Sequence, residues 1–404
     1  MTDTPTGPLA GLRVLDLTRV LAGPTCAQML GDLGAEIIKI EKPGSGDDTR
    51  GFAPPYVNGS KESAYFVGVN RNKKSVTVDI AQPEGQALVL RLLESCDILA
   101  ENFKVGALAK YGLGYEQLHA KFPRLIYCSI TGFGQTGPYA PRPGYDSLIQ
   151  AMGGVMSLTG EPDALPQKVG VPVADVFAGL YGCIGILAAL HHQQKTGQGQ
   201  HIDIGMLDTS VAWLANQGMN YLATGQNPPR LGSQHPNIVP YQTFATQDGH
   251  VVLSVANDPT FRRFCEVCGL DGVADDPRFA TNADRVGHKA ELLAILDPLL
   301  ASHPTTWWVD RLEAAKIGCG PINKLSEVFA DPQVQARGMV LDLPHKPSEG
   351  GTVRVIANPV RLSETPVNYR LPPPTLGAQT EEVLTGVLGM TAEEVAGLRG
   401  RGVV

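Results

Sequence analysis

The sequence predicts an α/β protein with a doubly wound parallel sheet, joined to a smaller α+β domain. Strand-like and helix-like segments alternate over residues 1–205, which is typical of a doubly wound sheet. Beyond residue 240 the pattern changes to short strands, YQTFATQDGHVVLSVAN, followed by helices that contain Trp307 and Trp308. The chain has 404 residues, which is enough for two or three domains.

The alternation begins with one strand–helix–strand unit. Residues 12–18 (LRVLDLT) and 35–41 (AEIIKIE) read as strands, and the segment between them has helical spacing that stops at Gly34. This order predicts parallel strands. The first turn reads R-V-L-A-G-P and lacks the G-x-G-x-x-G fingerprint. Glu41 is therefore not taken as the ribose-binding acid of a nicotinamide site.

Loops, strands and helices continue to alternate as far as residue 134. Residues 42–63 are rich in Gly, Pro and Ser and read as a long surface loop near a ligand site. The next strand begins with Arg71, Lys73 and Lys74, which are either solvated or form a cationic rim for phosphates. Helices are expected at 83–96 and 104–112, and strands at 97–102 and 125–134.

Four parts are expected along the chain. The large domain covers residues 1–205, and a linker helix at 206–225 leads away from it. The small α+β domain covers 226–325 and starts in a Pro- and Gly-rich stretch. Residues 326–404 contain helix, strand and polyproline pieces that are too small to stand alone. We therefore expect them to return to the large domain.

Composition argues against several classes of protein. Hydrophobic residues make up 43% of the chain, charged residues make up 18%, and the formal net charge is −7. This charge argues against a nucleic-acid-binding protein. Seven cysteines do not indicate a disulfide framework. Cys265 and Cys268 form one C-x-x-C without further ligands, so we expect two buried thiols and no metal site.

No segment predicts export or insertion into a membrane. The N-terminal MTDTPTGPLAGL lacks the basic and apolar regions of a secretory signal. The longest uncharged apolar run, 176–190, is shorter than the ~20 residues of a membrane span and contains three glycines. We therefore expect a cytoplasmic protein that contacts no membrane.

One acidic residue lies within the apolar stretch 166–194, PQKVGVPVADVFAGLYGCIGILAALHHQQ. This residue, Asp175, falls where a short buried segment meets the start of a helix. Burial raises the pKa of such a carboxyl group, whereas the N–H groups of a helix N-terminus lower it. From these residues alone, the favoured interpretation is that Asp175 caps the helix, because Asp is a preferred N-cap residue.

A series of motifs extends over practically the whole chain in a fixed order. They are VLDLTRVLAGP, IKIEKPGSGDDTR, NRNKKS, AENF, GFGQTGP, GYDSLIQAMGGVMSLTG, VGVPVAD, HPNIVPY and PPPTLG. Through them the chain resembles the class III coenzyme A transferases, the family that includes formyl-CoA transferase and carnitine CoA-transferase. The run 70–137 resembles the succinyl-CoA:glutarate and related succinyl-CoA:dicarboxylate CoA-transferases.

This resemblance implies both an architecture and an activity. The expected architecture is a Rossmann-like large domain with a small domain, in an interlocked homodimer whose ring-like subunits thread through each other. The expected activity is transfer of CoA from an acyl-CoA, succinyl-CoA above all, to a carboxylic acid such as a dicarboxylate. Acyl-CoA and the acid are then substrates, and no cofactor is expected to be bound permanently.

By the same resemblance, Asp175 is the nucleophile and carries an aspartyl-CoA thioester during the reaction. Covalent catalysis of this kind replaces one difficult exchange by several easier steps. Water must be kept out, because anhydrides and thioesters hydrolyse. The small residues Ala178, Gly179 and Gly182 either let the thioester approach the helix or serve helix–helix packing, and the sequence leaves both alternatives open.

The resemblance also implies a set of binding residues. CoA contacts carry over to Leu21, Ala22, Lys42, Asn102, Phe103, Lys104, Lys110, Gly144, Tyr145 and Asp146. Candidates for binding the acceptor acid are Arg50, Arg230, Gly232, Ser233 and His235. The glycine-rich lid of formyl-CoA transferase is reduced here to Gly232 and Ser233. Leu21 stands where that enzyme has a polar residue, which argues against formate or oxalate as acceptor.

Two other functions are compatible with the fold. The α-methylacyl-CoA racemases resemble this chain, but they use a His–Asp pair from a G-H-D motif for proton exchange. Here the motif reads Gly144, Tyr145, Asp146, and a Tyr with a reference pKa of ~10 is a poor base at neutral pH. A CoA-binding regulatory protein without turnover is the other alternative, and the presence of Asp175 in its motif argues against it.

Overall fold

The computed structural model describes residues 6–404 of the protein, and they divide into two compact units. Unit 1 contains the chain up to Val155, Val169–Leu214 and Gln333–Val404, and unit 2 contains Met156–Lys168 and Ala215–Pro332. The stretch 226–325, predicted as the small domain, lies in unit 2. Residues 156–168, which the sequence assigned to the large domain, also belong to unit 2.

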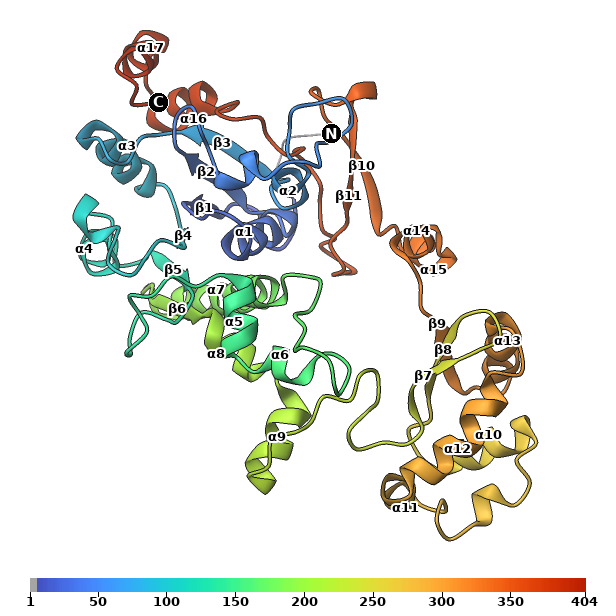
Figure 1. The fold of residues 1–404 in the computed structure, drawn as a ribbon. Helices are drawn as coiled ribbons and strands as arrows, with labels where there is room; N and C mark the ends of the chain where they lie inside the picture. Colours follow the sequence, from blue (N-terminus) through green and yellow to red (C-terminus); the bar gives the residue numbers. More distant parts are fainter. Residues whose placement is uncertain (1–5) are drawn as a thin grey trace. The chain divides into compact units, whose positions relative to one another are not determined.

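Unit 1 is built on a six-stranded parallel sheet with the strand order β3-β2-β1-β4-β5-β6 (Figure 1). Its strands are β1 (Arg13–Asp16), β2 (Glu36–Glu41), β3 (Lys73–Thr77), β4 (Ile98–Glu101), β5 (Ile126–Thr131) and β6 (His201–Gly205). The prediction of a parallel α/β sheet is confirmed. The chain order reverses between the neighbours β1 and β4, and sheets of this kind bind ligands beside that reversal, beyond the carboxyl ends of the strands.

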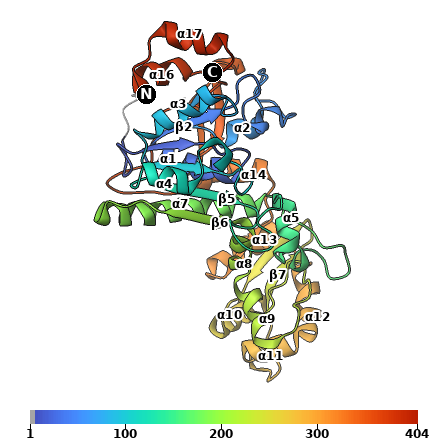
Figure 2. The same cartoon turned by 90° about the vertical axis from the view of Figure 1, so that its left-hand side faces the viewer.

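Helices cover both faces of this sheet (Figure 2). On one face, α1 (Ala22–Asp32) and α7 (Val173–Thr196) share a core with Val14 of β1. On the other face, α3 (Pro83–Leu93), α4 (Tyr115–Lys121), α16 (Thr380–Leu388) and α17 (Ala392–Gly400) share a core with the next residue, Leu15. Successive side chains of a strand point to opposite faces, which explains this division.

Short helical segments complete the connections of unit 1. They are η1 (Asp48–Gly51), α2 (Ala64–Gly68), η2 (Ala109–Tyr111), α5 (Asp146–Met152) and α8 (Met206–Ala212), with α6 (Val155–Leu158) and α15 (Pro332–Ala336) at the unit boundaries. The helix predicted at 104–112 is therefore only the three-residue turn η2. The helix predicted at 206–225 is broken between α8 and α9 (Ala215–Thr224), where Ala215 has a φ of 47°.

The glycines of α7 allow it to pack closely against α1 and the sheet. A Cβ placed on Gly179 would lie 2.5 Å from the carbonyl oxygen of Ala22, and one on Gly182 would lie 3.0 Å from Cδ1 of Ile130. The helix–helix packing interpretation of these glycines is thus supported by their contacts. At 24 residues, α7 is longer than the run 176–190 and meets the length and composition of a membrane span, although half of its most apolar stretch is buried within the protein.

The C-terminal segment lies along β3 and covers it. Within that segment, β10 (Val340–Pro344) and β11 (Thr352–Ile356) form an antiparallel pair. The amide of Asn72 donates to the Leu371 carbonyl at 2.9 Å, and the amide of Thr77 donates to Oγ1 of Thr380 at 2.9 Å. The residue before β3 and the last residue of β3 are therefore bonded to chain that comes from more than 290 positions away.

Arg71 and Lys73 are buried, so both the predicted cationic rim and its alternative, a solvated strand entry, are wrong for these two residues. The Arg71 guanidinium is buried and pairs with both carboxylate oxygens of Asp32 at 2.9 and 2.6 Å. The Lys73 ammonium is also buried and lies 3.2 Å from Oδ2 of Asp16. Burial lowers the pKa of Lys73 to about 8. Buried charges need such partners, so these two cations stabilise the fold instead of facing a phosphate.

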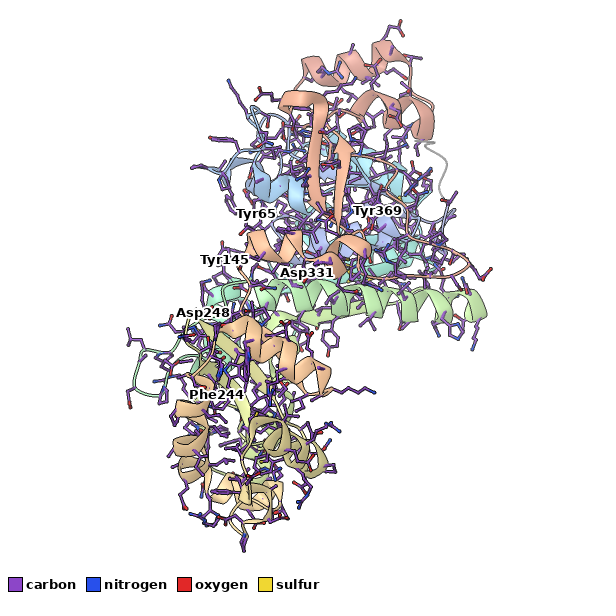
Figure 3. All side chains as sticks on the ribbon, turned by 90° about the vertical axis from the view of Figure 1, so that its right-hand side faces the viewer. Tyr65, Tyr145, Phe244, Asp248, Asp331 and Tyr369 are labelled. Atoms are coloured by element: carbon purple, nitrogen blue, oxygen red, sulfur yellow. The ribbon has the colours of Figure 1, made fainter. Side chains whose placement is uncertain are left out.

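Unit 2 combines a three-stranded antiparallel sheet with helices. The strands are β7 (Tyr241–Ala245), β8 (His250–Ser254) and β9 (Gly318–Pro321), in the order β7-β8-β9. The helices after β8 are α10 (Asp258–Cys268), η3 (Val273–Asp275), α11 (Asn282–Gly287), α12 (Lys289–Leu300), α13 (Thr305–Ala314) and α14 (Leu325–Ala330). Phe244 of β7 (Figure 3) and Trp308 of α13 are buried in their common core. Cys265 is buried and Cys268 half-buried on α10, and both thiols are free.

Candidate active site

Asp175 lies in a pocket of about 200 Å³ in unit 1. The pocket is lined by the β1–α1 turn, the segment after β4, the end of β5, the loop before α5 and the first turn of α7, together with Asp48 and Met206. Their lining residues include Arg19, Val20, Ala22, Asn102, Phe103, Lys104, Thr131, Arg142, Gly144, Tyr145, Asp146 and Asp175. The segments meet at the carboxyl ends of β1, β4 and β5, as the order of the strands requires.

The carboxylate that caps α7 belongs to Asp146 and not to Asp175. The helix begins at Val173, with Pro172 at the N-cap, and Asp175 is the third residue of its first turn. Oδ1 of Asp146 accepts a hydrogen bond from the Ala174 amide at 2.9 Å, and its Oδ2 accepts one from Gln150 at 2.7 Å. The interpretation that Asp175 is the cap is therefore wrong, and its carboxylate has no capping hydrogen bond.

The surroundings of Asp175 favour its neutral form. Burial, and after it the negative charge of Asp146, raise the pKa of Asp175 to about 7 from an ordinary value of 3.8. A carboxyl group that would be fully ionised in water is thus close to half protonated at neutral pH. Burial and then the charges of Asp175 and Asp146 also raise the pKa of Tyr65, a residue of α2 (Figure 3).

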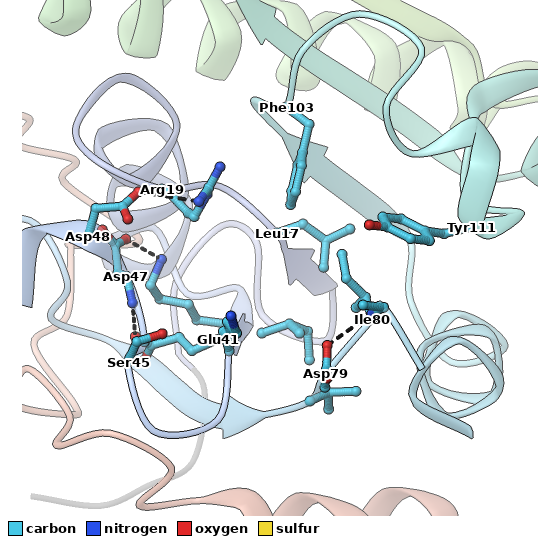
Figure 4. A pocket seen from close by; sticks show the side chains of 16 residues that line it. Leu17, Arg19, Glu41, Ser45, Asp47, Asp48, Asp79, Ile80, Phe103 and Tyr111 are labelled. Carbon is cyan, nitrogen blue, oxygen red and sulfur yellow. Dashed lines mark hydrogen bonds and ion pairs between the residues drawn. The ribbon is translucent and has the colours of Figure 1, made fainter. Parts of the chain in front are cut away.

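A second and larger pocket adjoins the first. It has a volume of about 440 Å³ and lies beyond the carboxyl ends of β1, β2 and β3 (Figure 4). Its lining includes Leu17, Lys39, Glu41, Lys42, Ser45, Asp79, Ile80 and Tyr111. Arg19, Asp48 and Phe103 line both pockets. The Arg19 guanidinium lies over the Phe103 ring at 5.1 Å from its centroid, so these two side chains mark the junction.

The structure brings most of the predicted CoA-binding residues together around the two pockets. The residues that line the Asp175 pocket are Ala22, Asn102, Phe103, Lys104, Gly144, Tyr145 and Asp146. Lys42 lines the larger pocket and is exposed. Leu21 is buried at the N-cap of α1 and makes no side-chain capping bond. Lys110 lies over the ring of Tyr111, which lines the larger pocket.

The predicted acceptor residues are divided between the two units. Arg50 belongs to unit 1, and its guanidinium makes two bonds to Glu41 at 2.8 and 2.7 Å while lying over the Phe66 ring. The third nitrogen of the Arg50 guanidinium, Nη1, lies 3.5 Å from Oε2 of Glu62, so Arg50 is already paired within unit 1. Gly232, Ser233 and His235 belong to unit 2, where Ser233 accepts from the amide of Thr243 at 3.1 Å. Their role in binding the acceptor stays a prediction.

Arg230 also belongs to unit 2. Its guanidinium donates to the carbonyl oxygens of Glu161 and Pro162 at 3.2 and 3.0 Å. These bonds hold the loop of residues 161–164 to the segment before β7, so the guanidinium already has partners within its own unit.

Sequence reasoning missed several residues of the site. Val20 has a left-handed backbone with a φ of 70°, and no pattern in the sequence announces this. Asp47 is buried, and its Oδ1 accepts from the amides of both Val20 and Thr49. The spacing D-x-T is typical of a side chain that bonds to the backbone two residues on. Arg142 lines the Asp175 pocket two residues before the Gly-Tyr-Asp motif, and its residue type alone does not distinguish it from a surface arginine.

Within residues 6–404, no three His, Cys, Asp or Glu side chains are arranged to hold a metal ion. The site combines the buried carboxyl group of Asp175, the carboxylate of Asp146, which helps to raise its pKa, and two adjoining pockets with basic residues in their lining. Such an arrangement is suited to attack on an acyl group that is delivered by a long, anionic carrier.

Comparison with known proteins agrees with this chemistry. CoA-transferase family III matches residues 9–380. A succinate–glutarate CoA-transferase of Agrobacterium fabrum is 49% identical over 395 residues, which are 95% of this chain and 97% of that protein. A succinyl-CoA:glutarate CoA-transferase of Mus musculus is 44% identical over 381 residues, 94% of this chain and 86% of that protein.

A solved structure is similar along nearly the whole chain. It is that of a CAIB/BAIF family protein from Brucella suis, which is 45% identical, has a TM-score of 0.83, and covers 95% of this chain and 100% of its own. Together with the site described above, these matches identify the chain as a member of CoA-transferase family III and a class III CoA-transferase.

Proposed function

We propose that this enzyme moves CoA from succinyl-CoA to a dicarboxylic acid through a covalent aspartyl-CoA thioester on Asp175. The observation that supports this most directly is the Asp175 carboxyl group, which lies in a pocket adjoining a larger one at the strand ends. The bacterial and mouse relatives are named for succinate or succinyl-CoA and glutarate, which supports dicarboxylates as the substrates.

The reaction needs no external acid or base overall. The Asp175 carboxylate attacks the thioester carbonyl of succinyl-CoA, the C–S bond breaks, and a mixed anhydride and CoA thiolate form. The thiolate then attacks the Asp175 carbonyl carbon, which releases succinate and leaves the aspartyl-CoA thioester. The acceptor carboxylate attacks this thioester to form a second anhydride and thiolate. Attack of that thiolate on the acceptor carbonyl gives the new acyl-CoA and frees Asp175.

Asp146 assists these reaction steps by raising the free energy of the ionised Asp175 nucleophile. The charge of Asp175 is opposed by burial and by Asp146, which accepts a hydrogen bond from the amide of Ala174, the residue before Asp175. In the anhydride and the thioester this charge is absent, so the repulsion is relieved when the covalent bond forms. A carboxylate of higher pKa is also a stronger nucleophile, provided that enough of it is ionised at the working pH.

The CoA chain is proposed to run from the larger pocket to Asp175. Its nucleotide end would occupy the pocket beside Lys42 and Tyr111, and its pantetheine arm would pass Arg19 and Phe103, which line both pockets. Basic side chains at the rim favour an anionic carrier. CoA would thus be a substrate that leaves after each cycle and not a resident cofactor.

Arg142 is the strongest candidate for the distal carboxylate of the acceptor. It lines the Asp175 pocket, its guanidinium lies 4.5 Å from the ring centroid of Tyr139, and within residues 6–404 no carboxylate pairs with it. Arginine matches the geometry of a carboxylate with two parallel hydrogen bonds. A dicarboxylate bound there would be held by one end while its other end reacts at Asp175.

We also propose that the enzyme works as an interlocked homodimer in the cytoplasm. The face of α7 that bears Tyr181, Ile184 and Leu187 exposes 39%, 59% and 38% of these side chains. They follow one another at three-residue spacing and so lie on one side of the helix. A second copy that covers this face would bury them. Sedimentation of wild type and Ile184→Asp tests the dimer, and cell fractionation tests the compartment.

A donor-by-acceptor screen tests the proposed function. Succinyl-CoA is incubated with glutarate, itaconate, citramalate or sulfinopropionate, and new acyl-CoA is measured by mass spectrometry. Hydroxylamine or borohydride trapping locates the acyl adduct. We expect exchange with at least one dicarboxylate and an adduct on Asp175, both lost in Asp175→Ala. Full exchange by Asp175→Ala would refute the nucleophile.

Racemisation of 2-methylacyl-CoA is the alternative, and the pocket gives it less support. Tyr145 stands in place of the His of the racemase motif, is 69% exposed, and no histidine is among the described residues that line the pocket. Loss of chirality of a 2-methylacyl-CoA without an acid acceptor would favour the racemase.

A further inference from the structure

The turn between β1 and α1 has an unusual backbone where it forms a wall of the Asp175 pocket. Val20 has a φ of 70°, in the left-handed region. For a residue branched at Cβ this conformation is a genuine outlier, and it persists only where surrounding contacts hold it in place. Arg19, Val20 and Ala22 all line the pocket, so the shape of this wall depends on that one backbone angle.

Asn102 holds the turn from the end of β4. Its side-chain Nδ2 donates to the carbonyl oxygen of Arg19 at 2.6 Å, and its Oδ1 accepts from the Arg19 amide at 2.8 Å. The Asn102 side chain thus pairs with both backbone groups of Arg19, as the backbone of a neighbouring strand would. It does so one residue after the end of β4. Next to it, the Glu101 carboxylate accepts from the amide of Phe103 at 2.8 Å, which joins the residues on either side of Asn102.

Asp47 holds the same turn from the other side. Its Oδ1 accepts from the Val20 amide at 3.2 Å, and its Oδ2 lies 2.9 Å from the buried ammonium of Lys39. Burial alone would raise the pKa of Asp47, but Lys39 and the Thr49 amide lower it below its usual value. Asp47 is therefore a fixed negative charge, and Val20 is bonded at its amide while Arg19 is bonded at both backbone groups.

We propose that Asn102 is a positioning residue. It holds the Arg19–Val20 turn in the left-handed conformation before substrate arrives. The proposal rests on the CoA-transferase reaction at Asp175. Both polar atoms of the Asn102 side chain are already bonded to Arg19, so a direct bond to CoA is not its main contribution. The turn that it holds places the Arg19 guanidinium over Phe103 at the junction of the two pockets.

A positioning role and a ligand role predict different kinetics. A turn that is held in advance lowers the barrier for reaction of a correctly placed thioester, so its loss lowers kcat. Loss of a bond that substrate and transition state share would raise KM and leave kcat unchanged. Only the positioning role predicts that the defect can be repaired at Val20, because glycine adopts a positive φ as readily as a negative one.

The test compares wild type, Asn102→Ala, Val20→Gly and the double variant. Steady-state CoA exchange is measured together with the Kd of CoA, and circular dichroism confirms that each protein is folded. We expect Asn102→Ala to lower kcat by about tenfold or more while the Kd of CoA changes less than about threefold. Asn102→Ala should lower kcat several-fold less when Val20 is already replaced by Gly than it does in the wild-type background.

Asn102→Asp keeps the fold testable if Asn102→Ala is unstable. It retains an acceptor for the Arg19 amide but places a second oxygen against the Arg19 carbonyl, so we expect a loss of kcat that Val20→Gly again reduces. A raised KM or Kd with unchanged kcat, or no recovery in the double variant, would overturn the proposal. Exchange that survives in Asp175→Ala would instead contradict the nucleophile, and the Asn102 comparison would still be readable from the exchange rate.

Discussion

Oδ1 of Asp146 accepts a hydrogen bond from the amide of Ala174 at 2.9 Å, so the carboxylate that caps α7 is not the carboxylate that this helix carries in its first turn. The two acids divide the work that the sequence had assigned to Asp175 alone. Asp146 satisfies the helix end and supplies a negative charge, and Asp175 keeps its oxygens free for an acyl group. This division leads to the first prediction.

Replacing Asp146 should separate its charge from its hydrogen bond. Asp146→Asn keeps an oxygen for the Ala174 amide but removes the charge, so the pKa of Asp175 should fall. The acid limb of the pH–rate profile should move to lower pH but stay above the ordinary pKa of an aspartate, because burial is the larger cause of the raised pKa. Asp146→Ala also removes the cap, so its free energy of unfolding should be about 1 kcal/mol lower than that of Asp146→Asn. An unchanged acid limb in Asp146→Asn would contradict this coupling.

The reaction should depend on the ionisation of Asp175. Its pKa is about 7, so formation of the trapped adduct should fall about tenfold per pH unit below 7 and level off above it. Single-turnover trapping across pH 5–9 measures this profile. A rate that is constant from pH 5 to 9 would be inconsistent with a nucleophile of raised pKa.

The same shift should appear in stability with a defined sign. Because the pKa of Asp175 is raised on folding, its contribution to stability is greatest below an ordinary value of 3.8 and is lost as the pH rises through about 7. Asp175→Asn should therefore be more stable than wild type at pH 8, by about 1–3 kcal/mol, and no more stable at pH 4. Denaturant unfolding at both pH values checks the sign.

Because α1 packs closely against α7, replacing Gly179 by a larger residue should lower the stability of the protein. A methyl group there would meet the Ala22 carbonyl oxygen at 2.5 Å, which should cost about 1–3 kcal/mol of stability and shift the wall of the pocket. Gly386 in α16 is a matched control, since a Cβ there meets nothing within 4 Å. Gly386→Ala should stabilise by up to about 1 kcal/mol. Equal effects of the two substitutions in thermal unfolding would contradict the packing explanation.

Lys73 and Lys74 are neighbours in sequence with different expected effects. Lys73→Met leaves the Asp16 carboxylate buried without its cation and should cost about 3–5 kcal/mol. Lys74 bridges the more exposed Glu36 and Glu382 at 3.1 and 2.8 Å, so Lys74→Met should cost less than about 1 kcal/mol. Neither change should weaken CoA binding beyond its effect on folding. A tenfold loss of CoA affinity in folded Lys74→Met would restore the phosphate-rim hypothesis.

Arg142 should discriminate between acceptors. Arg142→Gln should raise the KM of dicarboxylate acceptors by about tenfold or more, because one charge-assisted contact is lost, and should affect monocarboxylates less. Arg278→Gln in unit 2 is the control, since that side chain forms exposed ion pairs with Asp276 and Glu291. Equal KM values for wild type and Arg142→Gln with every dicarboxylate would exclude the assignment.

Much of the fold was predictable because it depends on local periodicity. The strands from β1 to β6 were found by their apolar runs, and their parallel order followed from the helices between them. The predictions of continuous helices at 104–112 and 206–225 are wrong. Both segments have residues that favour helix, but the backbone leaves the helical conformation, as at Ala215 with its φ of 47°. Propensity is a weak guide where tertiary contacts decide the conformation.

The sequence by itself determined the alternating α/β architecture, the family motifs and the position of Asp175 within them, because these depend on residue types and their spacing along the chain. Only the tertiary structure decided which groups those motifs meet. Asp146 caps Ala174 across 28 positions, Lys73 reaches Asp16 across 57 positions, and Asn102 reaches Arg19 across 83 positions. Such contacts form when distant segments pack together, and the charge state of Asp175 follows from that packing.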